Sequence, residues 1–579
     1  MNICIPYLHL MNSKSIVAIV FSAIFLIFSP VSSAHNKTQL NQASLDKAEL
    51  RVTTAGQISG KLIKDNAVIT WLGVPYAQAP IGNLRWKAPQ PVIPWKGVRS
   101  ATQHPQACPQ YTDELDSKRY IGTEDCLFLN IWRPNNNQPQ LPVHVYIHGG
   151  SNEQGMINNP ARLGDVLAQE GDMVVVTMQY RLGFLGWLYS HEDKSIDELD
   201  NSGNLGLLDI IESLKWVKNN IHSFGGDPNN ITLGGLSAGA QNIFNLLATN
   251  MASGLFHKAF IQSGIPIDYS KEQAKQASVK LEQTLLGKKY LQMSAKDIDK
   301  QMLDIPAKAI VDAGMKINPD FNAVRDGVVM PLTPTAQLIS DGNLINKVPI
   351  MVGLTKDEAK AWTCDRAYNV FNWLSPADAS LVGQYATELL TALTVETFYH
   401  ASQHSSSWPI YFYEMGYGSP DEQGRSPLPD ELGDCIGAFH TIDTSFHFGR
   451  WQHMVQSFWQ QLTFSDNNDI ARKNLSKEMM LRFVHFANHS HPNYKGAVVW
   501  PKISTGSKIN RLLFDVDVET SAVKAKSIDR LKSIAEIKAE IDQTFSLEQK
   551  KTLFPLINAF VSQFQGPEHA LLSLHASQN

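Results

Sequence analysis

The sequence lacks the features that several classes of protein require. It has no block of basic residues and no interleaving of aromatic with basic residues, so we set nucleic-acid binding aside. Its 50 basic and 55 acidic residues leave a formal net charge of −5. It also has no internal repeat and no low-complexity linker. With 579 residues, of which 43% are hydrophobic, one large domain with insertions is the economical interpretation.

An apolar segment near the N-terminus is too short for a comfortable membrane span. Ile16 to Phe28 covers thirteen residues, follows Lys14, and is followed by small residues up to Ala34. This pattern is typical of a secretory signal, so we expect residues 1–34 to be removed and the mature chain to be secreted or periplasmic. No cysteine follows that would carry a lipoprotein anchor. A retained anchor is the alternative, and Met11 is an alternative initiator.

Cysteine is scarce. Removing residues 1–34 takes Cys4 away and leaves four cysteines, at Cys108, Cys126, Cys364 and Cys435. An even number in an exported chain indicates two disulfides, and four cysteines allow three pairings. Cys108 and Cys126 are close in sequence, and the loop they would close is worth about 3 kcal/mol in the chain-entropy model. Four buried free thiols are the alternative.

Short β-branched runs alternate with segments of helical period. This alternation predicts an α/β fold with a largely parallel central sheet flanked by helices. The predicted buried strands are Val143–Ile147, Met173–Thr177, Ile231–Leu233, Ala259–Gln262 and Pro349–Val352. A helix that runs to about Thr249 is expected directly after Ser237.

The most specific local motif is the pentapeptide Gly235-Leu236-Ser237-Ala238-Gly239, which follows the predicted strand ending at Leu233. Glycines two residues before and after a serine allow a strained turn from strand to helix, which lifts the hydroxyl clear of the backbone. The N–H group of Ala238 can then face an oxyanion. Alone the motif has little weight, because chance supplies about 0.1–0.2 matches in a chain of this length.

A second glycine motif, His148-Gly149-Gly150-Ser151, follows the predicted strand that ends at Ile147. Consecutive small residues let backbone N–H groups turn toward a ligand, as the oxyanion loop of a serine esterase requires. An ordinary glycine turn is the alternative for this tetrapeptide taken alone. We interpret His148 as a residue that holds the loop in place.

A family resemblance follows from an eleven-residue match. The segment Glu124-Asp125-Cys126-Leu127-Phe128-Leu129-Asn130-Ile131-Trp132-Arg133-Pro134 resembles the signature of type-B carboxylesterases, which include cholinesterases, bacterial para-nitrobenzyl esterases and non-catalytic neuroligins. The likeness extends from about Leu50 to Asp515. It implies the α/β-hydrolase fold, with insertions that form the substrate pocket, and a carboxylic ester as a small-molecule substrate.

The resemblance also implies the partners of Ser237. The segment from Val348 to Glu358 resembles the one whose last residue orients the catalytic histidine, which indicates Glu358 and leaves Asp357 as a competitor. The segment ending at His440 resembles the histidine loop. The resemblance therefore implies a secreted serine carboxylesterase that works through an acyl-enzyme, with Ser237 as nucleophile and His440 as base.

The remaining groups of the expected mechanism come from the backbone. The N–H groups of Gly150, Ser151 and Ala238 would form the oxyanion hole, and the mechanism needs no cofactor and no metal. Because Cys364 lies six residues after Glu358 and Cys435 five before His440, those two cysteines are expected to pair. The family has precedent only for the pair of Cys108 with Cys126.

The chain departs from the family at several positions. Leu236 replaces the usual Glu before the nucleophile, Ser151 replaces the third loop glycine, and Thr441 and Asp443 replace the usual Gly and Glu after the histidine. We expect the loss of the acid at Leu236 to disfavour cationic substrates such as choline esters. The polar run from Ser151 to Gln154 could suit a polar or bulky acyl group, or be neutral drift. The pocket walls are expected from the insertions 265–319 and 369–407.

The C-terminal tail from about residue 518 has an apolar stripe near helical spacing, at Ile528, Leu531, Ile534, Ile537 and Ile541. We expect a helical appendage to a single catalytic domain that spans residues 35–579. We interpret this stripe as covering the core of its own domain. The alternative is that it forms a homodimer contact.

A second class of function remains open on sequence alone. The family contains adhesion proteins that keep the fold without activity, so a non-catalytic, cholinesterase-like binding protein is the alternative to an esterase. Such proteins are expected to lose the nucleophile or its partners, whereas Ser237, Glu358 and His440 are all present.

Overall fold

The computed structural model describes residues 49–112, 119–189, 197–365, 374–405, 407–451, 463–464, 468–504, 511–528 and 531–561. The chain divides after Leu45 into two units, and every feature described below belongs to the second, Asp46–Asn579. The predicted signal segment, residues 1–34, lies outside the described residues.

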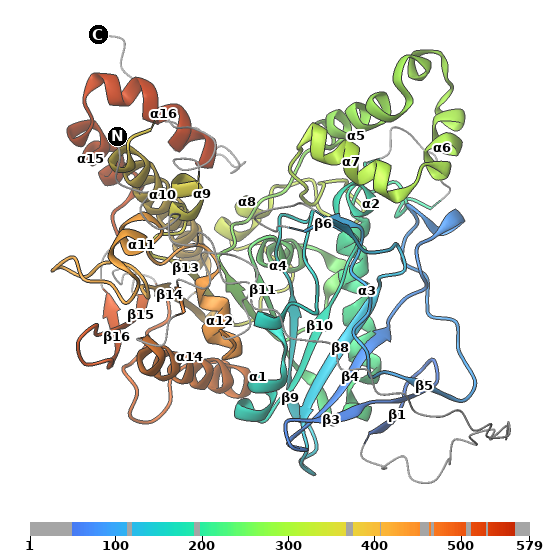
Figure 1. Cartoon of the computed structure of the whole chain (residues 1–579), viewed down its shortest axis with the longest axis horizontal. Coiled ribbons are helices and arrows are strands. Elements are labelled where there is room, and N and C mark those ends of the chain that lie inside the picture. The colour runs from blue at the N-terminus through green and yellow to red at the C-terminus, as the bar shows by residue number, and fades with distance from the viewer. Residues whose placement is uncertain are drawn as a thin grey trace, which may run out of the picture. The chain divides into compact units, whose positions relative to one another are not determined.

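A mixed sheet forms the centre of this unit (Figure 1). In the described part of the chain it has eleven strands: β3 (Lys61–Ile63), β4 (Val68–Pro75), β8 (Phe128–Pro134), β9 (Leu141–Ile147), β10 (Val174–Met178), β11 (Gly226–Leu236), β12 (Lys258–Gln262), β13 (Ile350–Thr355), β14 (Ile410–Met415), β15 (Arg511–Val516) and β16 (Val523–Ile528). Short strands outside it are β1 (Leu50–Val52), β2 (Gln57–Ser59), β5 (Val98–Ser100), β6 (Gln110–Tyr111) and β7 (Tyr120–Ile121).

The strand order is β16-β15-β14-β13-β12-β11-β9-β10-β8-β4-β3. Neighbours from β10 through β9 and β11 to β15 run parallel, whereas β8, β4 and β3 at one edge and β16 at the other are antiparallel. All five predicted strands lie in the parallel part. The predicted α/β class with a largely parallel sheet is therefore confirmed.

The helices of the described part are α1 (Asp165–Gly171), α2 (Gly183–Gly186), α3 (Leu205–Asn220), α4 (Ala238–Ala248), α5 (Lys271–Leu286), α6 (Ala295–Asp304), α7 (Ala307–Ile317), α8 (Thr335–Ser340), α9 (Lys360–Asp365), α10 (Pro376–His404), α11 (Asp430–Cys435), α12 (Ile442–Phe448), α14 (Asp469–His489), α15 (Ile534–Thr544) and α16 (Leu547–Val561). Helix α4 ends close to the predicted Thr249.

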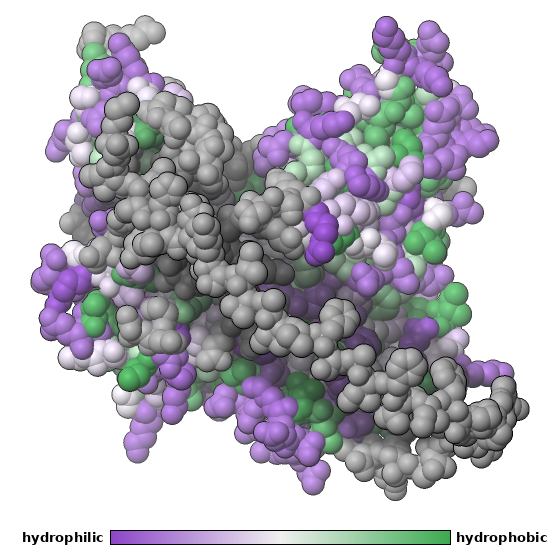
Figure 2. All heavy atoms as spheres, in the orientation of Figure 1, coloured by the Kyte–Doolittle hydropathy of each residue, from purple (hydrophilic) through white to green (hydrophobic). Residues whose placement is uncertain are grey.

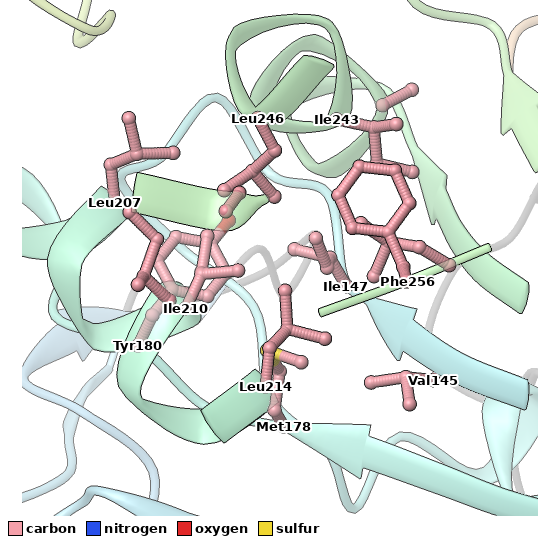
Figure 3. Close-up of a cluster of buried hydrophobic side chains, with 14 of the residues drawn as sticks. Val145, Ile147, Met178, Tyr180, Leu207, Ile210, Leu214, Ile243, Leu246 and Phe256 are labelled. Atoms are coloured by element: carbon pink, nitrogen blue, oxygen red, sulfur yellow. The ribbon is translucent and has the colours of Figure 1, made fainter. Parts of the chain in front are cut away.

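Helices cover both faces of the sheet because its central strands are buried on both sides. Along β9 the side chains of Val143, Val145 and Ile147 join a core with helices α3 and α4, part of which Figure 3 shows. Tyr146, one residue out of step, packs instead in a second core with α1, α12 and α14. This period of two is the geometry of an extended strand, and it explains why β9 is a continuous run of buried residues.

Hydrophilic residues cover most of the described surface that Figure 2 shows, and hydrophobic residues form small, separate patches there. Within the described ranges, no helix has both the length and the apolar content that crossing a membrane requires.

The C-terminal tail differs in part from the sequence prediction. Residues 523–528 form strand β16, which pairs antiparallel with β15, and the helices begin only at Ile534. Ile528 therefore belongs to a strand and not to the helical stripe. Ile537 and Ile541 of α15 are buried in a cluster with α10 and α16. The apolar stripe of α15 is thus covered within the chain, so it offers no ground for the homodimer alternative.

Two histidines lie in the second core without solvent contact. His144 Nδ1 is 3.2 Å from the carbonyl oxygen of Thr232, and its Nε2 is 3.1 Å from Nε2 of His447 on α12. A carbonyl oxygen only accepts, so His144 donates through Nδ1 and accepts the proton of His447 through Nε2. Burial lowers the pKa of His144 to about 3 and that of His447 well below its ordinary value. Both rings are therefore neutral in the folded protein.

Because both rings are neutral in the folded protein, we expect the free energy of unfolding to decrease in acid. Below pH about 6.5 the unfolded chain binds protons at these histidines and the folded chain does not, so stability present above that pH is lost as the pH falls. Between pH 7.5 and 5.5 the expected loss is about 1.4 kcal/mol for each histidine. Urea unfolding at the two pH values measures it. The loss should shrink in His447→Gln, and an equal loss in that variant would contradict the assignment.

Candidate active site

Ser237 lies in a tight turn between β11 and α4, as the glycine motif predicts. Its φ and ψ are 53° and −125°, a conformation that residues with a side chain rarely adopt. A Cβ atom at Gly235 would lie 2.8 Å from the backbone carbon of Gly239, and one at Gly239 would overlap the carbonyl oxygen of Ile147. Only glycine at these two positions lets strand, turn and helix pack this closely.

The loop after β9 lies against this turn. A Cβ atom at Gly149 would be 2.8 Å from Cβ of Ser237, and Gly150 and Ser151 have φ values of 115° and 56°. The backbone N–H groups of Gly150, Ser151 and Ala238 donate to no group in the described part of the chain. Ser151 and Ala238 also line the same pocket as Ser237. Three unused donors and the serine are therefore close together.

His148 holds this loop from behind. Its Nδ1 lies 2.9 Å from the carbonyl oxygen of Gly149, and its ring stacks on Tyr180 with centroids 4.6 Å apart. The Tyr180 hydroxyl donates to the carbonyl oxygen of His148 at 3.0 Å. Burial lowers the pKa of His148 to about 4, so the ring is neutral near pH 7. These contacts agree with the interpretation of His148 as a support for the loop.

Asn152 lies in the polar run after Ser151 but does not face the pocket. Its side chain is fully buried and points into the protein. Its amide donates to the carbonyl oxygen of Phe321 at 2.8 Å and accepts from Asn242 at 2.9 Å and from Tyr180 at 3.1 Å. Asn152 is therefore an anchor of the glycine loop, and in this run only Ser151 lines the pocket.

Glu358 and His440 form a direct hydrogen bond between Oε1 of the carboxylate and Nδ1 of the ring. The other oxygen of Glu358 accepts from Ser263 Oγ at 3.0 Å and from the N–H and hydroxyl of Thr355 at 2.7 and 2.9 Å. Burial alone raises the pKa of Glu358, but the charge and hydrogen bond of His440 and the two bonds from Thr355 outweigh it, so the pKa is lowered. The carboxylate therefore stays ionised beside the imidazole.

Asp357, the competing acid, points to a different partner. Its carboxylate pairs with Lys360 at 2.7 Å, accepts from the N–H of Ala438 at 2.9 Å and also bonds the hydroxyl of Ser419. Its backbone N–H donates to the carbonyl oxygen of Ala438 at 3.1 Å. Asp357 therefore holds the loop that carries His440, while Glu358 contacts the ring itself.

Leu236, which replaces the family's usual Glu, points away from the pocket. Its side chain is buried in the second core with Tyr146 and Phe260, and it does not line the pocket. Asp443 is also buried, and its carboxylate accepts from the Tyr413 hydroxyl at 2.5 Å and from the Gln262 amide at 3.1 Å. Burial raises the pKa of Asp443 to about 6.

A disulfide joins Cys108 and Cys126, as the resemblance implies, with an S–S distance of 2.04 Å. Within this loop Gln110 bonds both backbone groups of Gly155, at 2.8 and 2.9 Å, and so fixes the far end of the glycine loop. Cys435 is also disulfide-bonded. The side chain of Cys364, its expected partner, lies outside the described residues.

Ser237, Glu358 and His440 all line one cavity of about 260 Å³. Trp362 lies beside them, with its ring centroid 4.6 Å from that of His440. The other lining residues are Ser151, Ala238, Gln241, Ser263, Ile265, Ile267, Asp320, Phe321, Asn322, Leu354, Leu390 and Ala559. The expected insertions thus supply part of the wall. Among the described residues no group of three or more His, Cys, Asp or Glu side chains is placed to hold a metal.

Comparison with known proteins identifies the family. The family model described as "Carboxylesterase family" matches residues 46–372 and 373–530. The chain belongs to the carboxylesterase family. It is 32% identical over 472 residues to the para-nitrobenzyl esterase of Bacillus subtilis (strain 168), covering 78% of this chain and 92% of that protein. It is 30% identical over 523 residues to an acylcarnitine hydrolase of Rattus norvegicus, covering 79% and 86%.

Solved structures give the same result for this carboxylesterase. A para-nitrobenzyl esterase structure aligns with a TM-score of 0.64 and 27% identity, covering 83% of this chain and 97% of the other. A carboxylesterase of Geobacillus stearothermophilus aligns with a TM-score of 0.66 and 28% identity, covering 83% and 97%. The α/β-hydrolase fold is confirmed, and the protein is a carboxylic ester hydrolase.

Sequence reasoning missed four residues that position the site of this carboxylesterase. Ser263 and Thr355 bond Glu358, and Asn152 and Gln110 anchor the glycine loop. Ser263 lies in the family-like segment Gln262-Ser263-Gly264, directly after β12, and its φ of 51° marks a second strained turn. That segment was a usable signal for Ser263. Asn152 and Gln110 act through partners far away in the sequence, and Thr355 bonds Glu358 only three residues on but belongs to no motif that would single it out.

The anchoring role of Asn152 predicts a catalytic defect. Asn152→Leu removes three hydrogen bonds that hold the glycine loop, so the loop N–H groups should lose their fixed positions. We expect kcat for a nitrophenyl ester to fall about tenfold to a hundredfold, with a smaller change in KM. Steady-state kinetics measures both, with Glu153→Leu in the same run as the control. Unchanged kcat in a folded Asn152→Leu protein would contradict the role.

Proposed function

We propose that this carboxylesterase hydrolyses its substrates through an acyl-enzyme formed on Ser237. His440 takes the proton of the Ser237 hydroxyl as the oxygen attacks the ester carbonyl, and it then protonates the departing alcohol. Glu358 holds the imidazole in the required tautomer and stabilises its protonated form. A water activated by His440 releases the acid and restores the serine.

The observation that carries this proposal is the position of the three side chains on one cavity, with Nδ1 of His440 bonded to Glu358. That bond leaves Nε2 as the nitrogen for proton transfer. The four bonds to the Glu358 carboxylate keep it ionised, so it can favour the imidazolium that forms when Ser237 is deprotonated.

We propose that the N–H groups of Gly150, Ser151 and Ala238 form the oxyanion hole. They have no other acceptor in the described structure. Gly150 and Ser151 belong to a loop that is fixed at both ends, and Ala238 directly follows the serine at the start of α4. Each such donor is worth about 3 kcal/mol in the transition state because it is aimed before the charge develops.

We further propose that residues 1–34 direct export, that the chain is cleaved after Ala34, and that residues 35–579 form a single catalytic domain. The disulfide between Cys108 and Cys126 supports an oxidising compartment, periplasmic or extracellular. Cys435 is disulfide-bonded, and we propose Cys364 as its partner because it is the remaining cysteine of the mature chain.

The proposal predicts that Ser237→Ala abolishes ester hydrolysis. The alanine removes the attacking oxygen and leaves the fold intact, so kcat for para-nitrophenyl acetate should fall by at least about 10,000-fold. Release of nitrophenolate by purified parent and variant measures this. Equal rates from the two proteins would overturn the proposal.

Substitutions of the two adjacent acids, Glu358 and Asp357, should give different defects. Glu358→Gln cannot stabilise the imidazolium, so kcat should fall about a thousandfold or more while the melting temperature changes little. Asp357→Asn removes the charge that pairs with Lys360 and weakens the bond that holds the histidine loop at the N–H of Ala438, so it should lower the melting temperature and reduce kcat less than about tenfold. Kinetics and thermal melting of both variants test this, and a reversed ranking of kcat would assign the acid to Asp357.

A further inference from the structure

One wall of the cavity beside Ser237 is formed by segments that pack together outside the two cores of the sheet. Ile265, Leu390 and Ala559 line it, and they come from the segment after β12, from α10 and from α16. A third hydrophobic cluster, separate from the two cores of the sheet, joins these segments. Its buried members are Val382, Tyr385, Leu389, Leu390, Ala392, Leu393, Ile534, Ile537, Ile541, Phe545, Leu553, Phe554 and Ile557. This apolar wall is therefore the pocket-facing edge of a packed helical unit.

Helix α16 is positioned in this unit by its apolar side. Leu553, Phe554 and Ile557 are buried in the cluster, and Leu556 is partly buried against it. Ala559 lies three residues after Leu556 and so on the same side of the helix, where it reaches the cavity. In Figure 1, α15 and α16 lie beside α10, in agreement with the cluster they share.

This helix lies outside the part of the chain that the carboxylesterase family model matches, because that match ends at residue 530. Helices α15 and α16, Ile534–Thr544 and Leu547–Val561, both follow it. Ala559 therefore adds a lining residue to the pocket from a segment beyond the residues that the family model matches.

The rest of the lining is mixed, and it includes the apolar side chains of Ile267, Phe321, Leu354 and Trp362 as well as polar ones. Ser151, Gln241, Asp320 and Asn322 line the cavity, and none of its described lining residues is a lysine or arginine. An ester has an apolar part that gains free energy when it leaves water, and only apolar side chains can cover it without stranding polar groups. The apolar wall of Ile265, Leu390 and Ala559 is one surface that meets this requirement.

We propose that α16 is a selectivity element of this enzyme: Ala559, with Leu390 and Ile265, forms a wall that binds the alkyl group of the ester and sets the length that is accepted. The small side chain of Ala559 leaves space that a longer alkyl chain fills. The proposal rests on the serine esterase mechanism proposed above, because Ser237 fixes where the ester carbonyl lies relative to the wall.

The test is the chain-length profile of Ala559→Trp. The indole fills the space beside the wall, so kcat/KM for para-nitrophenyl acetate should stay within about twofold of the parent, while kcat/KM for the octanoate should fall by tenfold or more. Ala559→Leu should give a smaller shift in the same direction. A parallel series of acetate esters with alcohols of increasing length shows whether the wall contacts the acyl or the alcohol side.

The matched control is Ala539→Trp, which places the same indole on an exposed position of α15 that does not line the cavity. It should leave the ratio of kcat/KM for the octanoate to kcat/KM for the acetate unchanged. If the ratio of kcat/KM for the octanoate to that for the acetate is unchanged in Ala559→Trp and Ala559→Leu, while hydrolysis still depends on Ser237, the proposed role of the wall is contradicted. The proposed serine mechanism is not contradicted by that result. Failure of the parent to hydrolyse any ester in either series would instead overturn the proposed function.

Discussion

The site depends on the close approach of two backbones, the turn at Ser237 and the loop after β9. Gly239 packs against the carbonyl groups that end β9, and Gly149 packs against the serine itself. This contact places the loop N–H groups beside Ser237, and it forces Ser237 into a conformation that costs about 1–3 kcal/mol. The surrounding parallel strands hold that conformation, because β11 pairs with β9 on one side and β12 on the other.

A second set of contacts links Glu358 to the same framework. The Glu358 carboxylate is bonded by Ser263 at the end of β12 and by Thr355 at the end of β13, and Asp357 ties the next turn to the loop of His440. Neighbouring parallel strands end at one edge of the sheet, so residues far apart in sequence meet there. Buried carboxylates are costly unless bonded, and the four bonds to Glu358 meet that requirement.

The parallel strands and the turn at Ser237 were predictable from the residues, because strand runs and glycine spacing are local signals. Glu358 and His440 came only through the family resemblance, since no local pattern distinguishes one of 18 histidines. The sequence could not show where Leu236 and Asn152 point, because the direction of a side chain depends on distant partners. Asn152 is turned inward by Tyr180 and Asn242, and the wall at Ala559 exists only because α16 packs on α10.

The central claim, that Ser237 is the nucleophile, is tested most directly by covalent labelling. A fluorophosphonate reacts with a serine only where a base and an oxyanion hole activate it. Complete inactivation followed by peptide mass mapping should find a single adduct, on the peptide that contains Ser237. Inactivation with the adduct on any other residue, and an unlabelled Ser237, would contradict the account.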